Sequence, residues 1–164
     1  MPKLMMKQKV FSWGDQFSVK NEYEEELYKV KGQVWSLGKK LHVYDNLERE
    51  CIYIEQKVWT FKPRFFVYVN GKQVAEIVKE FGIKPRYSIN GLNWRVEGNF
   101  WEHDYRVLDG DRVIVTIRKA WMSWGDSYEL DIDRDEDTLC ALAVVLAIDC
   151  VNAQQAAAAA SASD

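Results

Sequence analysis

The chain has 164 residues, of which 48% are hydrophobic, and a formal net charge of −3. That length fits one domain that is large enough to bury a sizeable core. The acidic balance gives no general reason to expect nucleic acid as a partner. Aromatic residues make up 13% of the chain and include seven Trp, and so many large flat side chains indicate a packed interior.

The N-terminus and the cysteines indicate where the protein is located. Residues 1–7 contain no continuous apolar run, so we expect no secretory signal. Cys51, Cys140 and Cys150 have no metal-type spacing. On one helix, Cys140 and Cys150 would lie about 15 Å apart, which is beyond the reach of a disulfide. We therefore expect reduced thiols and a cytoplasmic location.

Residues 41–117 have the pattern of a series of short strands. Hydrophobic and more polar residues alternate there with the period of two that marks strands with one buried face, at Leu41/Val43, Ile52/Ile54, Phe65/Val67/Val69, Leu92/Trp94/Val96 and Val113/Val115/Ile117. The Asn-Gly pairs at 70–71 and 90–91 predict tight hairpins, because both central residues of a type I′ turn need positive φ. The segments amount to roughly eleven or twelve strands in a mainly antiparallel meander.

Basic residues are concentrated between Lys57 and Arg95, with eight Lys or Arg against Glu76 and Glu80 alone. Two cation-Pro-cation sequences stand at predicted strand beginnings, with a further lysine between them, and the five cations are Lys62, Arg64, Lys79, Lys84 and Arg86. If neighbouring strand ends bring them together, Arg and Lys side chains can hold a phosphate group. The alternative is an ordinary solvated surface.

Residues suited to catalysis or metal binding are few. His42 and His103 are the only histidines and fall on different predicted strands, without a Cys partner at ligand spacing, so we expect no zinc site. His103 and Asp104 would point to opposite faces of a strand. The alternating Asp131, Asp133, Asp135 and Asp137 lack the glycine and terminal glutamate of an EF-hand loop. We expect no enzymatic activity, no cofactor and no metal.

One four-residue sequence occurs twice, as Ser12-Trp13-Gly14-Asp15 and as Ser123-Trp124-Gly125-Asp126. The repeat is compatible with a duplicated ligand-binding turn. It is also compatible with a structural corner, in which Gly permits the turn and Trp fills the wall of the fold. A single short repeat favours the structural corner.

An apolar helix follows the strands. Residues 139–148 are ten consecutive small or apolar residues, and they follow the acidic segment 135–137, which suits the positive end of a helix. A helix that is apolar on every side is buried. Ten residues rise only about 15 Å, half of a bilayer core, which favours a protein core. Asp149, at the end of this run, is expected to be a structural anchor at the mouth of the core, bonded to water or to a Lys or Arg of the rim.

Strands and helix together predict the fold. An eight-stranded barrel has room only for its own side chains, whereas eleven or twelve strands can close around a helix about 10–12 Å across. We therefore predict a mainly β fold, a closed antiparallel barrel of about 12 strands enclosing a central hydrophobic C-terminal helix. Residues 1–152 form this single domain, and the Ala-rich tail 153–164 is expected to be frayed or disordered.

The chain resembles bacterial LURP-one-related proteins over roughly residues 3–151. The residues that carry the resemblance are Val30-Lys31-Gly32, Leu37-Gly38-Lys39-Lys40-Leu41, Tyr44-Asp45, Lys84-Pro85, Asn90-Gly91-Leu92, Glu97-Gly98-Asn99-Phe100 and Ser123-Trp124-Gly125-Asp126. That family is similar to the C-terminal domain of Tubby proteins and to phospholipid scramblases, which implies a twelve-stranded barrel around a hydrophobic helix. Tubby relatives bind phosphoinositides, but a shared fold does not imply a shared function.

The basic residues give the main functional hypothesis. It is a non-enzymatic module that binds an anionic phospholipid headgroup or another phosphorylated ligand, with the protein peripheral at a membrane. One alternative is a protein-interaction or structural barrel without a small ligand. The other is scramblase-like activity with the terminal helix as an anchor, which Asp149 disfavours because an Asp near the bilayer centre costs about 2.5–3.5 kcal/mol on insertion scales. We expect no transmembrane segment and no nucleic-acid partner.

Overall fold

The computed structural model describes residues 2–7, 16–33, 38–82, 86–99, 102–122 and 125–162, and it describes the backbone alone at residues 7, 121–122, 125–126 and 153–162. It contains twelve strands, a short 3₁₀ helix and one long α-helix. The strands are β1 (Lys3–Lys7), β2 (Gln16–Lys20), β3 (Glu26–Gln33), β4 (Lys40–Tyr44), β5 (Glu50–Gln56), β6 (Arg64–Val69), β7 (Lys72–Glu80), β8 (Arg86–Asn90), β9 (Trp94–Asn99), β10 (Asp104–Asp109), β11 (Arg112–Met122) and β12 (Gly125–Ile132).

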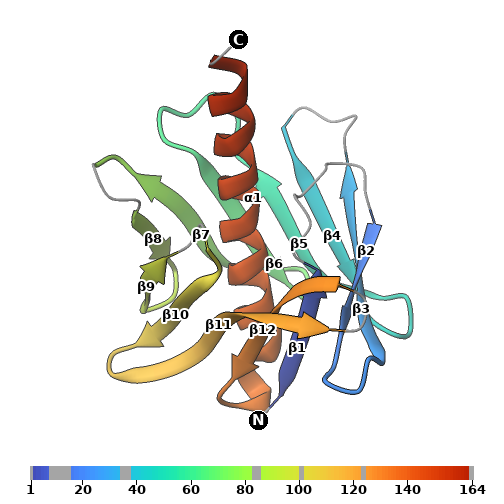
Figure 1. The fold of residues 1–164 in the computed structure, drawn as a ribbon. Helices are drawn as coiled ribbons and strands as arrows, with labels where there is room; N and C mark the ends of the chain where they lie inside the picture. Colours follow the sequence, from blue (N-terminus) through green and yellow to red (C-terminus); the bar gives the residue numbers. More distant parts are fainter. Residues whose placement is uncertain are drawn as a thin grey trace.

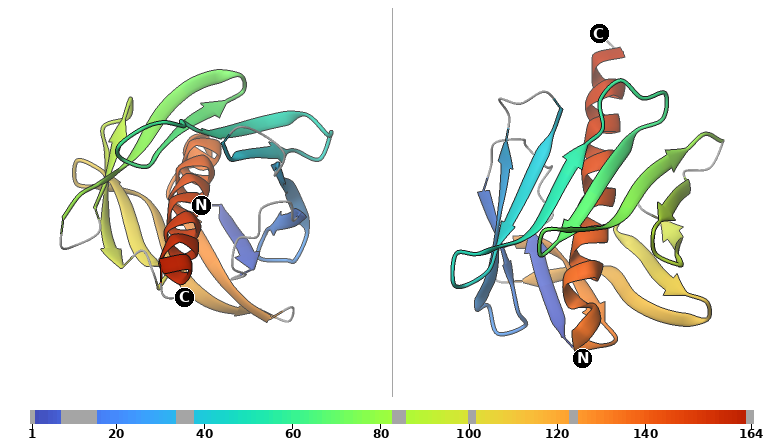
Figure 2. Two further views of the ribbon diagram at one scale, coloured as in Figure 1. Left: turned by 90° about the horizontal axis from the view of Figure 1, so that it is seen from above. Right: turned by 180° about the vertical axis from the view of Figure 1, so that it is seen from behind.

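The strands form one antiparallel sheet that curves around the helix (Figures 1 and 2). Its order is β8-β7-β6-β5-β4-β3-β2-β1-β12-β11-β10-β9, so almost every strand pairs with its neighbour along the chain. The first and last strands of the sheet, β8 and β9, are also consecutive along the chain, which leaves the barrel nearly closed. The predicted antiparallel barrel of about twelve strands is confirmed.

The helix α1 (Thr138–Ala162) passes through the centre of the barrel and follows the 3₁₀ helix η1 (Asp135–Asp137). Its residues 141–151 are all buried, and every side chain among them except Asp149 is apolar. The prediction of a helix without a water-facing side is therefore confirmed. Among the described residues, no helix is both long and apolar enough to cross a membrane. The backbone of α1 continues through the Ala-rich tail to Ala162, and fraying there stays a prediction.

The strand β11 departs from the predicted alternation. The residues predicted to share its buried face are Val113, Val115 and Ile117, but Val113 is half-exposed and Ile114 is fully buried. The reason is a bulge, because β10 residues 107 and 108 pair with residues 115 and 113 and leave Ile114 as the extra residue. A bulge reverses the face that the preceding residues present.

The two Asn-Gly pairs adopt different structures. Asn70 and Gly71 have φ of 50° and 80° and join β6 to β7 as the predicted two-residue hairpin. The predicted hairpin at Asn90-Gly91 is wrong, because β8 pairs with β7 and β9 pairs with β10. Gly91 instead lies at a corner against β7, where a Cβ atom would stand 2.7 Å from the carbonyl oxygen of Val74. Ser12-Trp13-Gly14-Asp15 and Ser123-Trp124 lie outside the described residues.

Candidate functional site

The basic residues singled out in the sequence lie at one end of three adjacent strands. Arg64 begins β6, Arg86 begins β8, and Lys79 is the penultimate residue of β7, which runs between these strands. Lys62 lies two residues before β6, and the backbone N–H of Lys79 donates to the carbonyl of Pro63 at 3.0 Å. Lys84 lies outside the described residues. The structure therefore brings the four described cations to the same end of the barrel wall.

Two of these cations are paired with carboxylates, which the sequence did not reveal. The Lys62 ammonium donates to Glu80 Oε2 at 2.5 Å, and Arg64 Nη1 donates to Glu76 Oε1 at 2.9 Å. The hydrogen bonds that Glu80 accepts from Lys62 and Ser88 lower the pKa of its carboxyl group. These pairs are partly exposed to solvent, where an ion pair contributes only about 0–1 kcal/mol. A phosphate group can therefore compete for both cations.

The other two described cations differ from each other. Lys79 is half-buried, and partial burial lowers the pKa of its ammonium group. The ladder places Lys79 opposite the buried Tyr87, and it places the exposed Arg86 opposite Glu80. Partial burial makes Lys79 a poorer point charge for a surface ligand than Arg86, because desolvation disfavours the charged form.

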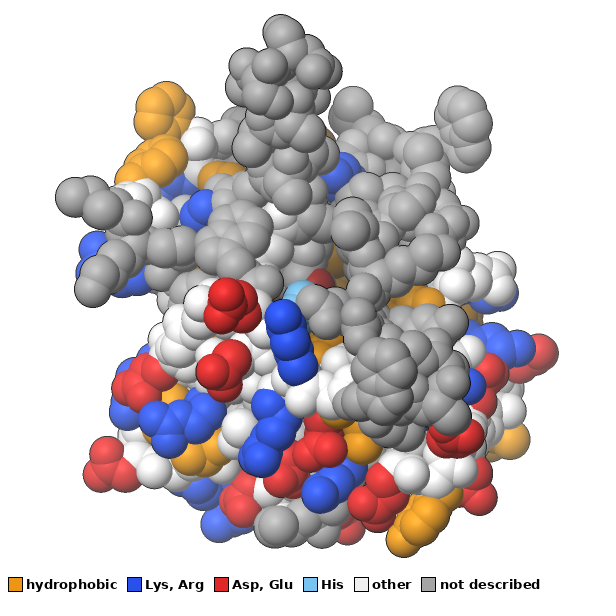
Figure 3. Space-filling model, viewed as in Figure 1, with side chains coloured by type: hydrophobic (Ala, Val, Ile, Leu, Met, Phe, Trp, Pro, Cys, Tyr) orange, Lys and Arg blue, Asp and Glu red, His pale blue; other side chains and the backbone are white. Residues whose placement is uncertain are grey.

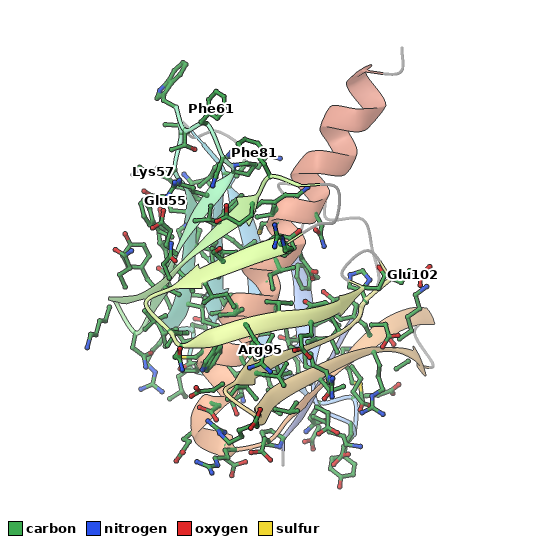
Figure 4. All side chains as sticks on the ribbon, turned by 90° about the vertical axis from the view of Figure 1, so that its left-hand side faces the viewer. Glu55, Lys57, Phe61, Phe81, Arg95 and Glu102 are labelled. Atoms are coloured by element: carbon green, nitrogen blue, oxygen red, sulfur yellow. The ribbon has the colours of Figure 1, made fainter. Side chains whose placement is uncertain are left out.

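Exposed aromatic side chains stand at the same end of the barrel. The residues are Trp59 and Phe61, which are 92% and 93% exposed, and Phe81, which is 57% exposed. The rings of Phe61 and Phe81 meet edge to face with their centroids 5.7 Å apart (Figure 4). We call this end of the barrel the apex and define it by Lys57, Trp59, Phe61, Lys62 and Phe81. The sequence alone did not reveal the aromatic part of the apex, although Trp59 and Phe61 alternate with more polar residues beside Lys62.

The loop 57–63 holds its aromatic residues outward by local hydrogen bonds. The backbone N–H of Lys57 donates to the carbonyl of Arg64 at 3.0 Å, and Thr60 Oγ1 donates to the carbonyl of Lys62 at 2.8 Å. Trp59 has φ of +61°, a conformation that is unfavourable for a bulky side chain. A strained residue whose ring is almost fully in water points to a role at this surface rather than in the core.

Lysine side chains approach the aromatic rings of this region. The Lys62 ammonium lies 5.7 Å from the centroid of the Phe81 ring, and the Lys57 ammonium lies 5.5 Å from that of Phe66. Hydrophobic side chains also project at the upper left of the face in Figure 3, while acidic and basic side chains are intermixed below. The apex therefore combines positive charge with protruding apolar surface.

A second group of polar residues lies inside the barrel around Asp149. This residue is 8% exposed, and its Oδ2 accepts a hydrogen bond from the Tyr128 hydroxyl of β12. His103 Nε2 lies 3.6 Å from Asp149 Oδ1, and the His103 ring stacks on Tyr128 with centroids 4.3 Å apart. Burial, together with the Asp149 charge, holds the pKa of the Tyr128 and Tyr105 hydroxyls well above 10. Both phenols therefore remain protonated and able to donate.

Asp149 is thus held by the barrel wall. Its described partners are Tyr128 and His103, where the sequence predicted water or a Lys or Arg of the rim. His103 occupies a turn with φ of +52° just before β10, not a strand. Within the ranges that the structure describes, no three His, Cys, Asp or Glu side chains are placed to hold a metal ion. This cluster ties α1 to the barrel wall.

Known proteins resemble this chain over almost its whole length. A family model described as LURP-one-related matches residues 2–149. The uncharacterized protein YxjI of Bacillus subtilis (strain 168) is 39% identical over 152 residues, which cover 92% of this chain and 94% of that protein. An X-ray structure of an Arabidopsis thaliana protein matches this fold with a TM-score of 0.62 at 18% sequence identity. The match covers 92% of this chain and 91% of the Arabidopsis chain. The last similarity shows the fold alone.

Proposed function

The chain belongs to the LURP-one-related family, and on that premise we propose that it is a non-enzymatic module that docks on membranes containing anionic lipid. The docking surface is the apex, where Trp59 and Phe61 enter the headgroup region. The described cations Lys62, Arg64, Lys79 and Arg86 form the adjoining anion-binding site, and Lys84 is assigned to it from its sequence position alone. Lipid phosphate groups are the ligands.

The observation that carries this proposal is the near-complete exposure of Trp59 and Phe61 beside Lys57 and Lys62. Burying a large apolar side chain contributes roughly 1.5–3 kcal/mol, which these two residues do not contribute to folding. Aromatic rings favour the membrane interface, where one end is apolar and the other wet. Each Lys or Arg near an anionic surface adds about 1 kcal/mol. The two contributions together suit reversible binding to a membrane surface.

The ion pairs at the strand ends fit this function. Lys62 and Arg64 form partly exposed ion pairs with Glu80 and Glu76. These pairs hold the two cationic side chains in place but contribute little free energy, so they can be exchanged. A lipid phosphate offers Arg64 a bidentate partner and Lys62 a point-charge partner, both with charge-assisted hydrogen bonds. Exchange of a carboxylate for a phosphate then requires no change in the barrel.

The test is co-sedimentation with vesicles of phosphatidylcholine, either alone or mixed with phosphatidylserine or a phosphatidylinositol phosphate. We expect binding only to the anionic vesicles, weakening as salt rises. Reversing Arg64 and Arg86 to Glu should lower the partition coefficient by at least about tenfold, because each lost cation removes about 1 kcal/mol and each added anion is repelled. Trp59→Ser with Phe61→Ser should lower it to a similar extent.

The control is a pair of exposed apolar residues at the opposite end of the barrel. Tyr23 and Leu47 are 75% and 70% exposed and lie in the turns before β3 and β5. Their replacement by Ser should leave vesicle binding unchanged. Binding that does not depend on lipid charge, or that survives the changes at the apex, would refute the proposal, as would stable capture of a protein partner without lipid binding.

A further inference from the structure

The outer face of the barrel wall has a hollow whose lining shares no residue with the apex. It has a volume of about 500 Å³ and crosses the outer face of β3 to β6. The side chains that matter for its chemistry are those of Gln33, Lys40, His42, Glu50, Tyr53 and Tyr68. The volume lies within the roughly 300–1,000 Å³ of ligand sites. We call this hollow the wall groove.

Aromatic rings form a row across the wall groove. The sheet register places His42 opposite Tyr53 and Tyr53 opposite Tyr68. Their ring centroids are 5.0 Å and 5.5 Å apart, and neighbouring planes are tilted by 47° and 48°. All three side chains are half-buried. Cross-strand aromatic pairs stabilise a sheet, but that effect alone requires neither a hollow nor converging polar groups.

Polar groups surround this row and hold each other in place. His42 Nδ1 lies 3.0 Å from Glu50 Oε1, and His42 Nε2 lies 3.1 Å from Gln33 Oε1, both hydrogen-bonding distances. The Glu50 side chain is 41% exposed, and a carboxylate has further acceptor positions beyond the one that His42 occupies. The Tyr53 hydroxyl donates to Glu55 at 2.6 Å. The wall groove is therefore ordered before any ligand arrives.

The mixture of donors and acceptors narrows the class of ligand. Lys40 supplies only donors, Glu50 supplies only acceptors, and the amide of Gln33 supplies both. A phosphate group accepts only and would meet the carboxylate of Glu50, whereas an amine donates only and would meet the ammonium of Lys40. A hydroxyl group both donates and accepts, so it can satisfy either partner. The opposite charges of Lys40 and Glu50 also favour a neutral ligand.

We propose that the wall groove binds a neutral saccharide. The apolar face of a sugar ring packs on Tyr53 and Tyr68, and its hydroxyl groups hydrogen-bond to Glu50, Gln33 and Lys40. This site is independent of the membrane docking proposed for the apex. Because the two sites use different strand positions and different charges, either proposal can fail without the other.

The experiment is a titration of the ¹⁵N-labelled full chain with cellohexaose, maltohexaose and chitohexaose, followed by amide chemical shifts. We expect at least one of them to give saturable shifts confined to β3–β6, at concentrations up to about 10 mM, as for a weak carbohydrate site. Tyr68→Ala and Glu50→Ala should each weaken binding by about tenfold, since each removes one hot-spot interaction worth more than 1 kcal/mol.

The matched controls use residues outside the wall groove. Tyr23→Ala removes a tyrosine that is 75% exposed in the turn before β3, and it should leave saccharide affinity unchanged, as should Trp59→Ser at the apex. If Tyr68→Ala does not fold, Glu50→Ala on the outer face provides the same test. Absence of saturable shifts with all three saccharides, or binding that persists in Glu50→Ala, would overturn the proposal. The proposal would also be overturned if a single-stranded oligonucleotide shifted the amide signals of the same residues while the saccharides did not.

Discussion

Replacing Tyr128 by Phe should destabilise the barrel through the helix rather than through lost packing. The Tyr128 hydroxyl is buried and donates to Oδ2 of the buried Asp149. Without it, the carboxylate keeps the contact with His103, whose Nε2 lies 3.6 Å from Oδ1. A hydrogen bond to a charged group contributes about 1.5–3 kcal/mol. We therefore expect a loss of about 2 kcal/mol in the free energy of unfolding, which lowers Tm by roughly 4–8 °C in a chain of this size.

The assay is urea unfolding at neutral pH, followed by circular dichroism and tryptophan fluorescence. Tyr23→Phe, in a side chain that is 75% exposed, is the control and should have no effect. In an Asp149→Ala background, Tyr128→Phe should cost little, because the hydroxyl then has no acceptor to lose. Equal losses of stability for Tyr128→Phe and Tyr23→Phe would refute the importance of this hydrogen bond, as would simple addition of the losses caused by the changes at 128 and 149.

Two further predictions concern a glycine and a thiol. Gly91→Ala should destabilise the protein more than Gly71→Ala in the same urea assay. Both glycines have positive φ, but only at Gly91 would an added Cβ meet the backbone, 2.7 Å from the carbonyl oxygen of Val74. Equal losses of stability would contradict this prediction. Burial raises the pKa of the Cys51 thiol from 9.0 to about 11. Its contribution to stability is therefore complete below about pH 9 and is lost as pH rises toward about 11, since the unfolded chain releases the proton first. Cys51→Ala should flatten that decline, and an unchanged slope would contradict it.

The sequence predicted the fold because its strongest signals are local. Residues 139–148 have no polar face, and that pattern alone requires burial on every side. Strand number followed from alternation and turn residues. Which residues of each strand face the core could not be predicted in the same way, because the extra residue Ile114 in β11 is defined only by its pairing with β10. Asn70-Gly71 and Asn90-Gly91 show the same limit, since both supply positive φ and only the pairing of the flanking strands separates a hairpin from a corner.

The site was predicted less well, because charge pairing depends on register. With regular pairing from a two-residue turn at 70–71, Arg64 would lie opposite Ile77, and Glu76 would then point to the other face of the sheet from Arg64. The bulge between Val67 and Tyr68 shifts the pairing by one residue, so that Arg64 pairs with Val78 and reaches Glu76 on the outer face. The sequence therefore predicted that Arg64 and Arg86 stand at strand beginnings. It could not show that Glu76 pairs with Arg64 or that Glu80 pairs with Lys62.

The exposed aromatic residues of the apex are difficult to explain by stability. The barrel fills its interior with the apolar residues of α1 and the inward faces of the strands, so its core is complete without the loop 57–63. Trp59 and Phe61 expose more than nine-tenths of their surface and add almost no buried area, while Trp59 also carries the cost of a positive φ. A residue that contributes little to folding and is held in a strained conformation is best explained by contact with something outside the chain. The cations at neighbouring strand ends support the proposal that this contact is with an anionic membrane surface.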